Sequence, residues 1–141
     1  MRFLLVEVGA RLCAVPLEFI AETMRSLPFE PLAAMPSFVL GVSLIRGRAS
    51  PVLDAGLLLG SAKTHASRFI ALKLGARSAA LAVDSVVGVR SLPESAEQEM
   101  SPLLSDAAVG SLATFDSKLL TVLRATSLVP DRLWKVLEKV A

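Results

Sequence analysis

The chain repeats its own plan once, and this internal repeat limits what the chain can fold into. Residues 3–11 (FLLVEVGAR) align with residues 69–77 (FIALKLGAR), and Phe, Gly, Ala and Arg are identical in the two segments. The tetrapeptide RSLP at residues 25–28 recurs at residues 90–93. The period is longer than the roughly 20–50 residues of solenoid repeats, and two copies are too few for an array. The sequence therefore predicts two units of one design.

Each unit has the pattern of a hairpin, an extended crossover, a second hairpin and a short helix. Apart from Arg2, Glu7 and Arg11, residues 1–8 and 11–15 are apolar on both faces, which predicts a buried first hairpin. In the second hairpin, residues 44–48 and 51–55 correspond to residues 114–118 and 121–125. About five short strands close into a small barrel more readily than they form an open sheet. We therefore expect an all-β domain over residues 1–141 with two packed barrels.

The boundaries follow from the polar and helical segments. We expect the first barrel unit over roughly residues 1–64 and the second over roughly 67–129, joined by a small, polar linker at 61–67. The other expected elements are a short helical segment at 17–21, loops at 29–35 and 94–105, and a C-terminal helix at 130–141. In that helix Leu133, Trp134, Leu137 and Val140 form one stripe. The stripe either docks on the core or binds a partner.

The segment 36–60, PSFVLGVSLIRGRASPVLDAGLLLG, reads as strand, tight turn, strand and short helix. Gly47 supplies the positive φ that the turn needs. Asp54 is placed to cap a helix over residues 55–59, which Gly60 ends. Pro51 has no N–H to donate, so its strand is an edge, or Pro51 lies at a bulge or at the start of the strand.

This segment resembles the signature of the CheW-like coupling proteins of bacterial chemosensory arrays. The matching positions are Pro36, Gly41, Val42, Arg46, Gly47, Pro51, Val52, Leu53, Asp54 and Gly60. Leu44 stands where the family usually has Asn, and Ala55-Gly56 replaces the usual Leu-Arg. These departures bear on which receptor or pathway is served more than on the fold. The resemblance implies a pair of SH3-like five-stranded barrels.

The resemblance also implies a function. Proteins of this family are non-catalytic adaptors that couple chemoreceptors (methyl-accepting chemotaxis proteins) to a CheA-type histidine kinase. The adaptor pairs with the regulatory barrel domain of the kinase and holds the cytoplasmic tip of the receptor in an apolar groove between barrels. We accordingly expect a cytoplasmic protein held at the inner face of the membrane through receptor arrays, without direct membrane insertion. The alternative within the family is a regulatory module of another chemosensory-type pathway, which would control motility or a second messenger.

Two charges belong to the first unit alone. Glu22 lies in an apolar context, and Arg46 ends an apolar strand. The second unit has Gly88 or Val89 at the position of Glu22 and Asp116 at the position of Arg46. A feature that breaks an internal repeat is a candidate for function. We expect Glu22 and Arg46 to form a partly buried ion pair that shapes a partner-binding surface; the alternative is that both are ordinary solvated charges.

Composition argues against other functions. An alternative from another class is a small β-barrel that binds a peptide or a nucleic acid, for which the sequence signature would be an aromatic-rich basic face. The net charge of +2 and the 5% content of aromatic residues give that alternative no support. The only histidine, His65, lies in the polar linker, and Asp54 and Asp84 stand where caps and turns favour aspartate. No spacing typical of a metal, cofactor or catalytic motif occurs, so we expect no cofactor and no enzyme activity. We expect Cys13 to be a core residue.

Overall fold

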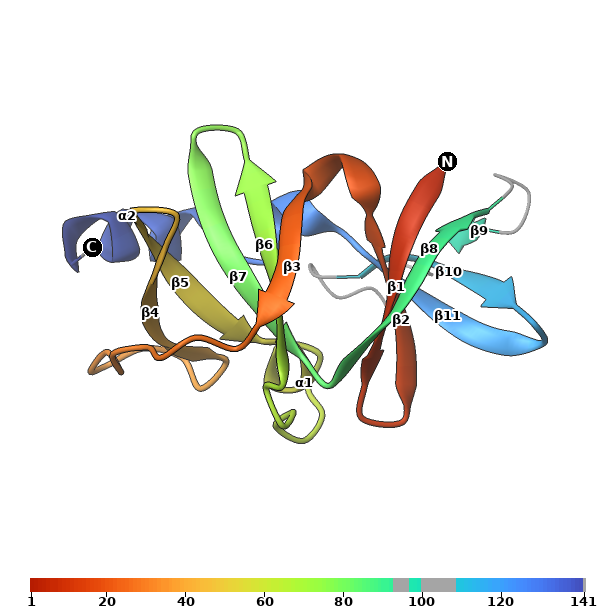
Figure 1. Ribbon diagram of the computed structural model, residues 1–141, viewed down its shortest axis with the longest axis horizontal. Helices are drawn as coiled ribbons and strands as arrows, with labels where there is room; N and C mark the ends of the chain where they lie inside the picture. The colour runs from red at the N-terminus through yellow and green to blue at the C-terminus, as the bar shows by residue number, and fades with distance from the viewer. Residues whose placement is uncertain (93–96, 100–108, 141) are drawn as a thin grey trace.

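The computed structural model describes residues 1–92, 97–99 and 109–140, and most of them are in strands (Figure 1). The strands are β1 (Arg2–Val8), β2 (Arg11–Pro16), β3 (Ile20–Arg25), β4 (Val39–Ile45), β5 (Arg48–Asp54), β6 (Arg68–Leu74), β7 (Arg77–Val83), β8 (Ser85–Ser91), β9 (Glu97–Glu99), β10 (Val109–Phe115) and β11 (Lys118–Leu123). The helices are α1 (Ala55–Leu58) and α2 (Asp131–Val140), with 3₁₀ turns η1 (Leu17–Phe19) and η3 (Ala125–Ser127).

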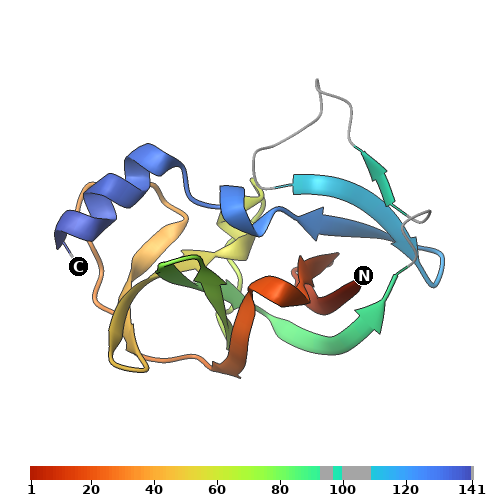
Figure 2. The same cartoon turned by 90° about the horizontal axis from the view of Figure 1, so that it is seen from above.

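The strands form two sheets, and each sheet contains strands from both repeats. The six-stranded sheet has the order β8-β1-β2-β11-β10-β9, and the five-stranded sheet has the order β3-β6-β7-β5-β4. The first hairpin of each repeat therefore pairs with the crossover strand and the second hairpin of the other repeat. The expectation that residues 1–64 and 67–129 each form a separate barrel is wrong, because the repeats exchange their first hairpins. The two sheets lie side by side along the long axis (Figure 1, Figure 2).

The pairing registers confirm the internal repeat. Val52 in β5 pairs with Ala80 in β7 in parallel, and the corresponding Val122 in β11 pairs with Ala14 in β2, also in parallel. Both second hairpins carry a register shift at the same place, one after Val39 and one after Val109. The turns of these two hairpins also match, because both central residues have positive φ in each. The values are 52° and 76° in the β4–β5 turn and 48° and 62° in the β10–β11 turn. Turns of this kind fit the twist of a hairpin.

The fold class agrees with the expectation: the chain is all-β, with two sheets of five to six strands and few short helices. The sheets curve, but no pairing among the described residues joins the two edges of either one, so neither barrel is closed. The helical segment expected at 17–21 is shorter, since η1 ends at Phe19 and β3 begins at Ile20. Most of the loop expected at 94–105 lies outside the described residues, and β9 accounts for 97–99.

The C-terminal helix docks on the core. Leu133, Trp134 and Leu137 are buried in the main apolar cluster, while the side chain of Val140 lies outside the described part of the chain. Arg77 stacks its guanidinium 5.1 Å from the centre of the Trp134 ring and donates a hydrogen bond of 2.7 Å to Glu138. The stripe is therefore a docking face, as the first of the two expectations has it. No described helix reaches the length and apolar character needed to cross a membrane.

Candidate functional site

The β4–β5 hairpin carries most of the signature residues, and one of them permits a close backbone crossing. The segment before β4 passes across Val42: the N–H of Glu30 donates to the Val42 carbonyl at 2.8 Å, and the N–H of Val42 donates to the Glu30 carbonyl at 2.9 Å. A Cβ atom on the neighbouring Gly41 would lie 2.2 Å from the Glu30 carbonyl oxygen. The glycine is therefore required at this position by space. Ser43 adds a hydrogen bond of 2.8 Å to the Pro28 carbonyl.

The structure brings Glu22 and Arg46 together, as the sequence predicted. Nε of Arg46 donates to Oε2 of Glu22 at 2.7 Å, and Nη2 donates to Oε1 at 3.0 Å. This two-bond geometry is specific to arginine among the basic residues. The hydrogen bond from Arg46 lowers the pKa of Glu22, and the same bond raises the pKa of Arg46. The pair links β3 to the turn of the β4–β5 hairpin, two elements that are not neighbours in the sheet.

The ion pair is more exposed than expected. The Arg46 side chain is 77% exposed and the Glu22 side chain 31% exposed. Arg46 stands at the turn itself, where its positive φ of 52° directs the chain back on itself and leaves the side chain in solvent. The expectation of a partly buried pair is therefore wrong for Arg46 and holds only for Glu22. A guanidinium that is open to solvent while its carboxylate partner holds it in one orientation is available to a binding partner.

Asp54 lies at the opposite end of β5 and is completely buried. Its carboxylate accepts the N–H of Leu57 at 2.9 Å, which caps α1 as predicted. It also accepts the N–H of Thr64 at 3.2 Å and the hydroxyl of Thr64 at 2.6 Å. Asp54 thus fastens the linker 61–67 over α1. Gly56 allows that approach, since a Cβ atom there would lie 2.0 Å from the Ala62 carbonyl oxygen.

The other signature residues have local roles. Gly47 has φ of 76° in the turn, as expected, and Pro36 accepts the N–H of Val39 in a turn before β4. Pro51 is not on an edge strand, because β5 lies between β4 and β7. Pro51 pairs with Val42 of β4, and the parallel pairing of β5 with β7 begins one residue later, at Val52. The missing N–H therefore falls just before the pairing with β7 starts.

Thr64 and Glu30 are the residues that sequence reasoning missed. Both lie in segments that read as polar linker or loop, and no spacing connects them with Asp54 or Gly41. The glycines were the available signal: Gly41 and Gly56 each stand in a regular element where a glycine weakens the structure unless another backbone approaches closely. Asp84 was assigned to a turn, and its carboxylate accepts the N–H groups of Gly9 at 2.6 Å and His65 at 2.7 Å.

Metal ligands and the single cysteine are the remaining candidates for chemistry. The described residues contain no group of three or more His, Cys, Asp and Glu side chains that could hold a metal ion. Burial raises the pKa of the Cys13 thiol to about 11, with a smaller opposing effect of Arg11. Cys13 is fully buried in the main apolar cluster, so the expectation of a core residue is confirmed. What the geometry offers is a set of surfaces.

Comparison with known proteins identifies the family of the chain. The family model described as CheW-like domain matches residues 2–132. The chain is 33% identical over 109 residues to "Protein FrzA" of Myxococcus xanthus, covering 75% of this chain and 68% of that protein. The crystal structure of the scaffolding protein TtCheW from Thermoanaerobacter tengcongensis shares the fold, with a TM-score of 0.81, 22% identity and coverage of 90% of each chain. The chain therefore belongs to the CheW-like domain family, the adaptors and scaffolds of chemosensory signalling.

Proposed function

We propose that this protein is a non-catalytic adaptor that couples the cytoplasmic tips of chemoreceptors to a CheA-type histidine kinase. The match of residues 2–132 to the CheW-like domain family supports the proposal. In this role the protein catalyses no covalent reaction. Its function is the coupling free energy between simultaneous interfaces, which makes the activity of the kinase depend on the state of the receptor. Such an adaptor works in the cytoplasm, in receptor arrays at the inner face of the membrane.

The kinase surface that we propose is the turn end of the β4–β5 hairpin. Leu44 is 70% exposed there, next to the Arg46 side chain that Glu22 holds in place. Large apolar side chains on a rigid hairpin supply binding free energy without a large cost in conformational entropy. A barrel domain of the kinase would meet this end through apolar contact, with Arg46 giving orientation.

The receptor surface that we propose lies on β3 and β8, which both face the viewer in Figure 1 and lie on the same side in Figure 2. Val87 and Val89 of β8 are exposed there, and β8 is an edge strand of its sheet. Alternate residues of β3, including Ala21 and Thr23, are exposed as well. Small and apolar side chains from both sheets suit the packing of a helical hairpin tip.

Titration of the protein with the regulatory domain of the CheA-type kinase from the same genome tests the kinase arm. We expect binding that changes little between low and moderate salt, because apolar contacts are not screened. Leu44→Ser should weaken it, whereas Leu119→Ser, which alters another largely exposed leucine, on β11, should not. Absence of binding, or a steep dependence of the affinity on salt, contradicts the proposal for this interface.

Capture from lysate tests the partners as a pair. An adaptor of this kind recovers both a chemoreceptor and a kinase, and a Val87→Asp variant should lose the receptor while it retains the kinase. The alternative, a regulatory module of another chemosensory-type pathway, has the same fold and differs in its partners. Recovery of a kinase of a different pathway without a receptor supports that alternative.

A further inference from the structure

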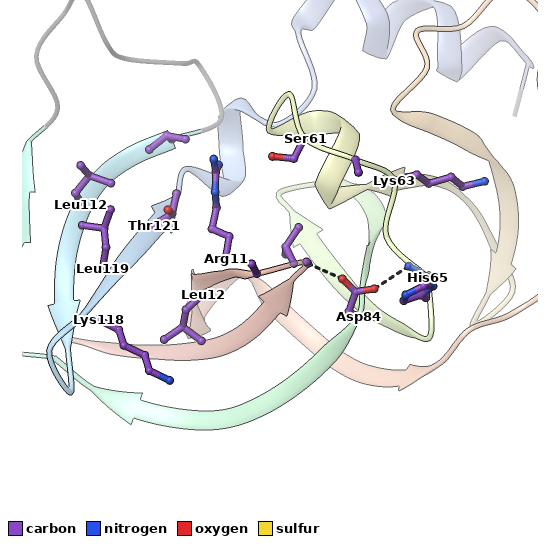
Figure 3. Close-up of a pocket in the computed structure, with 15 residues that line it drawn as sticks. Arg11, Leu12, Ser61, Lys63, His65, Asp84, Leu112, Lys118, Leu119 and Thr121 are labelled. Atoms are coloured by element: carbon purple, nitrogen blue, oxygen red, sulfur yellow. Dashed lines mark hydrogen bonds between the residues drawn. The ribbon is translucent and has the colours of Figure 1, made fainter.

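A groove lies where the two sheets meet, at the turn end of the β1–β2 hairpin (Figure 3). Its volume is about 850 Å³. One wall is the β1–β2 turn, a second is formed by β10 and β11, and a third is the linker between α1 and β6. Neither the signature residues of the β4–β5 hairpin nor the surface proposed for the receptor lines it.

The side of this groove formed by the six-stranded sheet is apolar. Leu12 of β2 and Leu112 of β10 are partly buried there, and Leu119 of β11 is 62% exposed. Figure 3 shows Leu112 and Leu119 close together and Leu12 apart from them, and Leu12 packs against the apolar cluster that contains Leu5 and Leu120. Leu119 is exposed although residues 120–123 of the same strand are buried, and together with Leu112 it leaves adjoining apolar surface in the groove.

The rim of the groove is basic. Arg11, Lys63 and Lys118 come from three different walls, and all three are exposed. Figure 3 shows Lys118 on one side, Arg11 near the middle and Lys63 on the other side. No salt bridge to any of the three occurs in the part of the chain that the structure describes. An adjoining cavity shares Arg11 and Lys118 and is lined also by Glu7, Arg90 and Asp116, so its opposite charges are closer in number. Val87 of the proposed receptor surface lines that adjoining cavity too.

Asp84 carries the one carboxylate among the described residues that line the groove, and backbone N–H groups bind both of its oxygens. Oδ2 of Asp84 accepts the N–H of Gly9, and Oδ1 accepts the N–H of His65. Partial burial acts to raise the pKa of Asp84, but these two backbone hydrogen bonds outweigh it and the pKa is lowered. Asp84 therefore stays ionised and ties the β1–β2 turn to the linker, which fixes two walls of the groove relative to each other. Its charge is partly offset by the two N–H dipoles, and the field of the rim remains positive.

We propose that this basic groove binds an extended segment of a partner protein that carries both carboxylates and large apolar side chains. The apolar side takes leucine-like side chains, and the three cations pair with the carboxylates beside them. Charge complementarity of this kind sets orientation and speeds association. A nucleic acid fits less well, because no described Phe, Tyr or Trp lines the groove, His65 is its single ring, and leucine offers no stacking partner for a base. This surface is additional to the kinase and receptor surfaces proposed above.

A titration followed by NMR tests the proposal with the intact chain. The probe is a short synthetic peptide composed of glutamate, leucine and serine. We expect shifts of the backbone amides of Gly9, Leu12, His65 and Leu119, and binding that weakens as salt rises, since the rim charges are exposed. A peptide with lysine in place of glutamate, and one with serine in place of leucine, should bind at least several-fold more weakly.

Variants separate the groove from other sites. The triple variant Arg11→Gln, Lys63→Gln, Lys118→Gln should lower the affinity for the acidic peptide about tenfold. The control is the double variant Lys73→Gln, Lys135→Gln, which changes two exposed lysines elsewhere and should leave the affinity unchanged.

Equal binding of the lysine peptide, an equal loss in the control, or shifts of the same size with free glutamate would overturn the proposal. So would a dimer of the unliganded protein that Leu119→Ser dissociates, since the occupant is then a second copy. Failure here leaves the kinase titration unaffected, because that interface depends on Leu44.

Discussion

The two second hairpins, β4–β5 and β10–β11, share a backbone and differ in what is attached to it. Both have the same register shift, the same turn conformation and the same parallel contact with a first hairpin. The β4–β5 hairpin has Gly41, Arg46 and Asp54 where the β10–β11 hairpin has Ser111, Asp116 and Arg124. The repeat thus specifies the scaffold, and the three differences specify a crossing strand, an ion pair and a capped linker.

The differences also separate two kinds of charged residue within one strand pair. Asp54 is fully buried, and its hydrogen bonds fasten other parts of the chain. Arg46 is mostly exposed and holds one partner side chain at the surface. Position in the sequence signature does not distinguish them, since both belong to it. Burial does: Asp54 maintains the fold, and Arg46 is available to a partner.

The largest effect that we expect concerns the repeat units themselves. Residues 1–64 expressed alone should be unfolded or aggregate, because β1–β2 pairs with β8 and β11 and β4–β5 pairs with β7, all from the other repeat. Isolated two-stranded hairpins are marginal at best in water. Circular dichroism during heating measures this. Co-expression with residues 65–141 should restore a soluble complex. A cooperative unfolding transition of the fragment alone would show that the exchange of hairpins is not needed.

This exchange is the part of the fold that sequence could not supply. Each strand and turn of the β1–β2 and β4–β5 hairpins could be predicted, because apolar runs, Gly9, Gly47 and Asp54 act locally. Which hairpin pairs with which depends on contacts between the repeats, and an internal repeat makes the two choices chemically similar. The pairing of Glu22 with Arg46 could be proposed because both break the repeat. The exposure of Arg46 could not, since it depends on how the turn is oriented.

The next effect compares two glycines at neighbouring register positions of the hairpins. Gly41→Ala should destabilise the protein by at least the ~1–3 kcal/mol typical of overpacking, because the added Cβ would overlap the Glu30 carbonyl. Gly110→Ala is the control, since the nearest atom there, Cβ of Arg124, is 3.6 Å away. Urea unfolding of both variants gives the difference in free energy. Equal costs would mean that the crossing strand yields without penalty.

A third comparison concerns the residues that precede the short helices. Asp54→Ala removes the cap of α1, which costs about 0.5–2 kcal/mol, and leaves the buried Thr64 donors without their acceptor, which costs about 1–3 kcal/mol. Arg124→Ala, at the corresponding position before η3, should cost little because Arg124 makes no capping hydrogen bond. Asp54→Asn should fall between the two, since it retains one oxygen. Denaturant midpoints measure all three, and a cost of Arg124→Ala equal to that of Asp54→Ala would remove the distinction.

The smallest effect on stability should come from the ion pair, where the effect on binding should exceed it. In a double-mutant cycle with Glu22→Gln and Arg46→Gln, we expect a small coupling energy, because an exposed pair is solvated in either state. The pH dependence of the coupling energy follows from the lowered pKa of Glu22. The coupling is complete above the ordinary pKa of glutamate, and it is lost as the pH falls through the lowered pKa of the folded protein. Arg46→Lys should recover only part of the coupling, since an ammonium cannot make both hydrogen bonds.

Binding of the kinase regulatory domain by the same variants decides the role of Arg46. A loss of affinity in Arg46→Gln that clearly exceeds its loss of stability assigns Arg46 to the interface. Unchanged affinity would make the pair a local brace between β3 and the hairpin turn, and the surface distinction between the two hairpins would then rest on Leu44 alone.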